Sequence, residues 1–142
     1  MTYYEEPQDV VAQDKVGNRV AFHLAMSWRP YHGKNAPVDG FLYGTSLQAV
    51  VEVKCREPKY RDYVDYTVDL EKIEKLLDLA EALRITPYYV ARFPSELLIY
   101  EPYRQDLKAF ETGEQTHGIR QTTKIVIHIP WVAFRVMEVA GG

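Results

Sequence analysis

The chain has 142 residues, of which 46% are hydrophobic and 26% charged, and its formal net charge is −3. This length suffices for a single domain over residues 1–142 with its own core, and the single cysteine, Cys55, excludes an internal disulfide framework. The acidic balance counts against a protein that binds nucleic acid through a large basic excess, and no apolar run is long enough to span a membrane.

The N-terminal part of the sequence predicts a helix, a turn, a strand and a loop. Residues 5–15 suit a short first helix, and the Gly-Asn pair at 17–18 is typical of a helix end. In residues 19–28, apolar side chains alternate with the others, which predicts a strand. Residues 29–37 are rich in turn-forming and basic residues, so we expect a loop there.

Two further strands are expected to form a hairpin. Residues 38–43 predict one strand and residues 47–54 the next, with a Gly-Thr-Ser turn between them. The second strand carries apolar residues at nearly every position of its middle part. Such a run indicates a central strand that is covered on both faces.

The strongest helix signal follows a polar, tyrosine-rich connection over residues 55–68. Residues 69–84 carry apolar side chains at helical spacing, and Asp69 can cap the helix or lie in its first turn. Residues 88–93 then predict a strand. Strand, helix and strand in this order predict a crossover with parallel pairing.

The rest of the chain predicts more strands. Residues 97–100 and 124–129 suit strands, and the polar stretch 102–123 between them suits a long loop. For residues 131–139 the spacing of the apolar residues fits either a helix or a strand. The order of elements predicts an α/β domain with a mixed sheet.

Chemistry-bearing residues gather on the predicted hairpin. Twelve residues separate Asp39 from Glu52, and Lys54 lies two residues further on the same strand. Residues two apart on a strand share a face, so Glu52 and Lys54 point the same way. If residues 44–47 form a four-residue loop, or if a shorter loop is combined with a bulge, Asp39 lies opposite Glu52. With a plain three-residue loop it lies opposite Val51.

Two carboxylates and an ammonium group at the end of an apolar strand are costly to bury unless they are paired or bind a metal ion. Converging carboxylates repel each other, and a hard cation such as Mg²⁺ relieves that repulsion. An alternative is that Glu52 and Lys54 form a cross-strand ion pair at a sheet edge. Motifs for nucleotide-phosphate loops or for a serine nucleophile do not occur, and the histidines share no metal-ligand spacing.

This pattern resembles the PD-(D/E)XK nuclease superfamily, over roughly residues 5–100. Val38-Asp39 is followed by Glu52-Val53-Lys54 and then by the predicted helix at 69–84; the proline of the family name is one position early, at Pro37. The resemblance implies a restriction-endonuclease-like mixed β-sheet with flanking helices. It also implies Mg²⁺- or Mn²⁺-dependent hydrolysis of DNA, with Asp39 and Glu52 as metal ligands and Lys54 as the catalytic lysine.

Family members often add an acidic residue from the first helix, for which Glu6 is the best match and Glu5 and Asp9 are alternatives. Candidate nucleic-acid contacts are the basic residues near the motif, namely Arg56, Lys59, Arg61, Arg29 and Lys34. Interleaved tyrosines and basic residues between 57 and 66 suit a DNA backbone or unpaired bases, or else a solvated connector.

The sequence therefore predicts an intracellular, possibly phage-encoded, metal-dependent deoxyribonuclease, endonuclease or exonuclease, acting on branched or other recombination and repair substrates. By analogy with small nucleases, we expect DNA and a second copy of the chain as partners. The alternative is a catalytically inactive module of the same fold that binds nucleic acid or a protein. A more distant alternative is an unrelated α/β domain.

Overall fold

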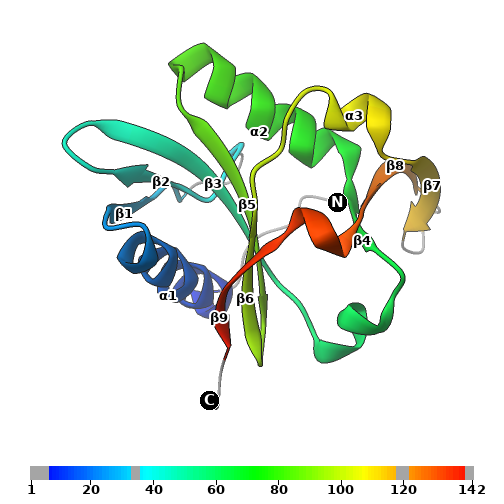
Figure 1. Cartoon of the computed structure of the whole chain (residues 1–142), viewed down its shortest axis with the longest axis horizontal. Coiled ribbons are helices and arrows are strands. Elements are labelled where there is room, and N and C mark those ends of the chain that lie inside the picture. Colours follow the sequence, from blue (N-terminus) through cyan, green and yellow to red (C-terminus); the bar gives the residue numbers. More distant parts are fainter. Residues whose placement is uncertain (1–6, 33–35, 118–121, 140–142) are drawn as a thin grey trace.

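A computed structural model describes residues 7–32, 36–117 and 122–139, and within them the chain forms two sheets and their covering helices (Figure 1). Sheet A has six strands in the order β1-β2-β3-β5-β6-β9, and sheet B has three in the order β4-β8-β7. The elements in chain order are α1 Pro7–His23, β1 Ser27–Pro30, β2 Gly40–Tyr43, β3 Leu47–Cys55, η1 Pro58–Asp62, β4 Tyr66–Asp69, α2 Leu70–Leu83, β5 Thr86–Phe93, β6 Glu96–Tyr100, α3 Asp106–Ala109, β7 Thr112–His117, β8 Thr122–Ile129, η2 Trp131–Ala133 and β9 Arg135–Val139.

Sheet A is mixed, as the sequence predicts. Strand β3 pairs with β2 in antiparallel and with β5 in parallel, and α2 makes the connection between the two parallel strands. The five residues from Ala49 to Val53 are all buried, which confirms that β3 is a central strand covered on both faces. The predicted α/β class, a mixed sheet with flanking helices, is therefore confirmed.

The two faces of sheet A carry separate apolar cores, one under α1 and one under α2. Helix α1 packs Val16 and Val20 against the face that holds Val51. Helix α2 packs against the opposite face, where Leu76 lies in the same core as Val50. Because side chains alternate along a strand, β3 sends successive residues into opposite cores. The face toward α2 is the one that continues to Glu52.

The first helix expected at residues 5–15 is present as α1, but the turn and the strand expected after it were wrong, because this one helix continues through the expected turn to His23. Gly17 lies inside α1, where a Cβ atom would come within 2.2 Å of the Trp28 ring. This glycine therefore allows close packing and does not end the helix. The helix ends at His23, where the N–H of Met26 donates to the Ala21 carbonyl and Ala25 has φ 57°. The expected strand at 19–28 is replaced by the end of α1 and the start of β1.

The second half of the chain confirms the helix at 69–84 and the strands at 88–93, 97–100 and 124–129 to within two residues. The expected loops were wrong in part, because they contain β4, α3 and β7. Residues 131–139 form a 3-10 turn followed by β9, which is an edge strand of sheet A. No helix in the described ranges is long and apolar enough to span a membrane.

Candidate active site

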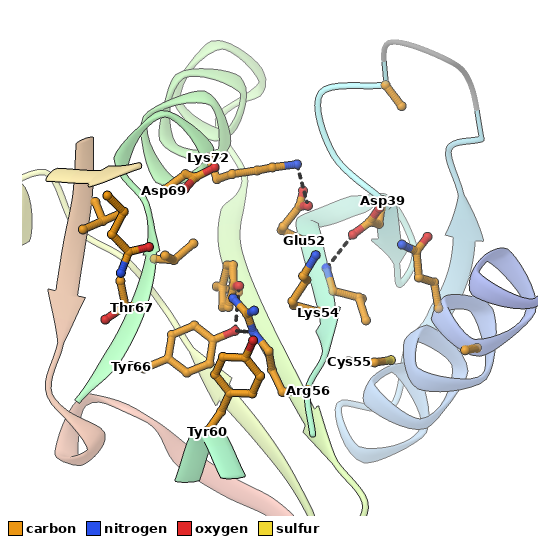
Figure 2. A pocket seen from close by; sticks show the side chains of 18 of the residues that line it. Asp39, Glu52, Lys54, Cys55, Arg56, Tyr60, Tyr66, Thr67, Asp69 and Lys72 are labelled. Carbon is orange, nitrogen blue, oxygen red and sulfur yellow. Dashed lines mark hydrogen bonds and ion pairs between the residues drawn. The ribbon is translucent and has the colours of Figure 1, made fainter. Parts of the chain in front are cut away.

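A cleft of about 1190 Å³ lies where sheet B separates from sheet A. One wall is the carboxyl end of β3, and the other is β4 with the start of α2; α1 and η1 lie at its margins. In Figure 2 the side chains of Glu52 and Lys54 point from β3 into this space, and Thr67 lies on the opposite wall. The face of β3 that is apolar under α2 thus becomes polar where the two sheets part.

Asp39 reaches the same face because of a bulge in the hairpin. The loop is three residues long, since Tyr43 pairs with Leu47, but the register shifts after Leu42 so that Gly40 pairs with Val51. Asp39 therefore lies level with Glu52. Its N–H donates to the Val51 carbonyl at 3.1 Å, and its Oδ2 accepts from the Val53 N–H at 2.7 Å. These two bonds fix the carboxylate beside β3 (Figure 2).

Glu52 is a buried carboxyl group, with a relative exposure of 8%. Burial, and after it the neighbouring charge of Asp39, raise its pKa to about 8. Lys72 on α2 acts against this shift, and its Nζ lies 3.6 Å from Oε1 of Glu52. The pair Asp39–Glu52 is therefore two crowded carboxyl groups with one lysine as partial compensation.

Lys54 and Arg56 continue the line of Glu52 along the cleft face. Within the described residues neither forms an ion pair. Lys54 is exposed and points into the cleft. Arg56 is half-buried: its guanidinium lies 4.8 Å from the Tyr60 ring centre and 5.3 Å from that of Tyr66. Its Nε donates to the Tyr66 hydroxyl at 3.0 Å.

The Tyr66 hydroxyl also shares a hydrogen bond of 2.8 Å with the hydroxyl of Tyr89. Tyr89 is buried on β5 and pairs in register with Glu52. Burial raises the pKa of Tyr89 well above its ordinary value, so this residue stays protonated and neutral. A buried hydrogen-bonded chain from Arg56 to Tyr89 thus forms the floor of the cleft next to Glu52.

The other predicted nucleic-acid contacts do not all join the cleft. Lys59 is not part of the lining; its Nζ lies 3.3 Å from Glu57 and 5.8 Å from the centre of the Tyr60 ring. Arg61 is not part of the lining either and forms an ion pair with Glu96 at 3.3 Å. Arg29 lies over the Tyr43 ring and is not part of the lining. The predicted residues Glu6 and Lys34, and the alternative Glu5, lie outside the described residues, and the side chain of Asp9 is not described.

Sequence reasoning missed Lys72 and Tyr89, and it included Tyr66 only among the interleaved tyrosines of residues 57–66, without its strand. Lys72 lies in the first turn of α2, where the polar face of a crossover helix approaches the end of the strand before it; that position was a usable signal. Tyr66 and Val68 alternate with Thr67 and Asp69, a short strand pattern hidden in a polar connection. Tyr89 could be placed only once the register of β5 against β3 was known.

Comparison with known proteins finds similarity among solved structures. No protein-family model matches the chain, and no curated protein sequence does. Among solved structures, that of Hjc, a Holliday junction resolvase from the archaeal hyperthermophile Archaeoglobus fulgidus, is similar with a TM-score of 0.47 and 15% sequence identity. The similarity covers 90% of this chain and 89% of that chain. The case for this chain's chemistry rests on its own residues.

Proposed function

We propose that this chain is a divalent-metal-dependent nuclease that hydrolyses phosphodiester bonds of DNA in the cleft. The observation that supports it most is the crowding of Asp39 and Glu52 at the end of a buried strand, with Lys54 next to them on the same face. A structural role would pair each carboxylate with a cation. Here burial and a second carboxylate raise the pKa of Glu52, and Lys72 offsets them only in part, a pattern that is common where proteins do chemistry.

The residues fit a hard divalent cation. Asp39 and Glu52 offer oxygen ligands, which Mg²⁺ and Mn²⁺ prefer, and their mutual repulsion is the feature that such an ion removes. Within the described residues no three acidic, histidine or cysteine side chains are placed so that they could hold a metal ion together, so Asp39 and Glu52 would be the ligands from this part of the chain. A bound ion supplies Lewis-acid stabilisation of the charge on the phosphate oxygens.

Lys54 is the third member of the proposed site. Its ammonium group has no carboxylate partner in the described part of the chain, and it points into the cleft two residues beyond Glu52. In this proposal it donates hydrogen bonds to the attacking water and to the phosphate, and so offsets the negative charge of the transition state. Arg56, next along the same face, holds the adjoining part of the backbone.

The alternative is a module of the same fold that binds nucleic acid or protein without cutting it. The ion pair between Lys72 and Glu52 favours this reading, because Lys72 already compensates the carboxylate that a metal ion would use. The net charge of −3 points the same way. Metal binding separates the two, since only the nuclease requires Lys72 to give way to a divalent ion.

Partners and substrate form remain parts of the proposal. We propose DNA as the substrate, cut by an endonuclease or exonuclease mode on branched or other recombination substrates. We also propose a homodimer, by analogy with small nucleases that address two strands with two sites. Sedimentation equilibrium tests the dimer, and a mass of one chain over the micromolar range would exclude it.

The nuclease activity is tested with labelled linear, single-stranded and four-way-junction DNA in Mg²⁺ or Mn²⁺, beside samples in EDTA. We expect cleavage that needs the metal ion and that Lys54→Ala lowers by at least about 100-fold, the effect of removing one transition-state donor. Lys108→Ala, an exposed lysine on α3, is the matched control and should cut like the wild type. No cleavage of any substrate would leave the binding module as the better account.

A further inference from the structure

The unpaired positive charge in the cleft lies on one wall only. Lys54 near the end of β3 and Arg56, the first residue after it, form no ion pair within the described residues, and the N–H of Arg56 still donates to the Arg92 carbonyl on β5 at 2.8 Å. Same-face residues of a strand are about 6.6 Å apart, close to the spacing of successive phosphates in a polynucleotide. The hydrogen bond and ring contacts hold Arg56 through Nε and its flat faces, which leaves its terminal N–H groups available for an anion.

The facing wall carries acidic side chains. Asp65 and Asp69 line the cleft from β4 and the segment before it. Nearby positive groups are already engaged: Lys124 lies 3.4 Å from Asp69, and Lys72 lies 3.6 Å from Glu52. A DNA duplex presents phosphates on two strands. Asp65 in turn lies 3.2 Å from Nδ1 of His128, so in the described part of the chain the facing wall offers a second backbone no lysine that is not already held by a carboxylate.

Aromatic rings lie at the end of the basic line. Tyr60 and Tyr63 line the cleft with their rings edge to face, 5.6 Å apart. Tyr63 is 54% exposed, and it comes directly after η1, in which Tyr60 packs against the apolar core. An exposed ring beside a basic track is the arrangement on which unpaired bases stack, and a base inside a duplex cannot reach such a ring.

From these features we infer that the cleft binds a single polynucleotide strand, with its phosphates along Lys54 and Arg56 and an unpaired base stacked on Tyr63. The proposed nuclease function enters this inference at one point, the position of the phosphate that would react. If the chain is a nuclease, its substrate is a single strand, or a single-stranded segment of a larger substrate, which enters the cleft without its complement.

The test is binding without cleavage. In EDTA, fluorescence anisotropy measures the affinity for a labelled single-stranded DNA, for the same sequence as a duplex, and for the RNA single strand. We expect the DNA single strand to bind at least about tenfold more tightly than the duplex, with Tyr63→Leu and Arg56→Met each weakening it by about tenfold. The RNA arm shows whether the strand's sugar matters. Thermal melting confirms that the variants fold.

The matched controls are Tyr103→Leu and Lys108→Met, an exposed tyrosine and an exposed lysine away from the cleft. Both should bind as the wild type does. Equal or tighter binding of the duplex, loss of affinity in the controls as large as in the cleft variants, or no binding to any strand would overturn the inference. Because the assay contains no metal ion, its result is independent of whether the chain cuts DNA.

Discussion

Glu52 and Glu138 lie on different strands of sheet A, and their surroundings shift their pKa values in opposite directions. Glu138 on β9 accepts from His23 at 2.7 Å and from Arg19 at 2.8 Å, and Arg92 lies 3.3 Å away. These hydrogen bonds, that with His23 first, lower the pKa of Glu138 to about 2. Burial and the neighbouring Asp39 raise that of Glu52 to about 8.

The contrast separates a structural carboxylate from a candidate functional one. Glu138 joins α1, β5 and β9 through complementary charges, so its ionised form stabilises the fold. Glu52 is buried next to a like charge that Lys72 compensates only in part, so its ionised form destabilises the fold when no metal ion is bound. Strongly shifted pKa values occur in both kinds of place, and it is the direction of the shift that distinguishes them here.

The largest expected effect is on cleavage. Glu52→Gln removes a proposed metal ligand and should lower the rate of DNA cleavage in Mg²⁺ by at least about 100-fold. Glu138→Gln leaves the cleft intact and should cut within about twofold of the wild type. Initial rates at equal protein concentration measure both. If the two variants lose activity equally, the distinction between the glutamates fails.

The next effect is on stability, with opposite signs. In EDTA at pH 8, Glu138→Gln should lower the free energy of unfolding by about 1–3 kcal/mol, because it weakens charge-assisted hydrogen bonds. Glu52→Gln should raise it by about 1–3 kcal/mol, because it removes a buried charge next to Asp39. Urea denaturation measures both values. A less stable Glu52→Gln protein would show that the Lys72 contact outweighs the repulsion.

A smaller effect is the dependence of stability on pH. The folded-state pKa of Glu52 is above its unfolded value, so its contribution is full below pH 4.5 and is lost as the pH rises toward about 8. The pKa of Glu138 is lowered, so its contribution is present above pH 4.5 and is lost as the pH falls toward about 2. Melting temperatures measured against pH without metal should show this. Glu52→Gln should make the melting temperature less dependent on pH near neutrality, and Glu138→Gln should do the same at acidic pH. An unchanged dependence on pH would contradict both assignments.

The sequence predicted the central part of the fold well, because its signals there are local and strong. The apolar run of β3, the apolar stripe of α2 and the strand after it together predict a parallel crossover, which the structure has. The bulge that brings Asp39 level with Glu52 was one of the two hairpin geometries expected to do so. The position of Glu52 and Lys54 on one face follows from strand periodicity alone, whereas that of Asp39 depends on the bulge.

The errors arise where tertiary contacts decide. Gly17 signals a helix end locally, but its missing side chain makes room for Trp28. Buried residues Val16, Val20 and Ala21 have helical spacing, yet the alternation from Val20 onward also suits a strand. Strand β7 has few apolar residues, so its pairing with β8 leaves no pattern in the sequence.

The most direct test of the account is calorimetric titration of Mn²⁺ into the wild type, Glu52→Gln and Glu138→Gln. The wild type and Glu138→Gln should bind the ion with similar affinity, and Glu52→Gln should bind at least about tenfold more weakly, as loss of a ligand requires. Absence of binding to the wild type, or equal binding by Glu52→Gln, would contradict the claim that Asp39 and Glu52 form a metal site.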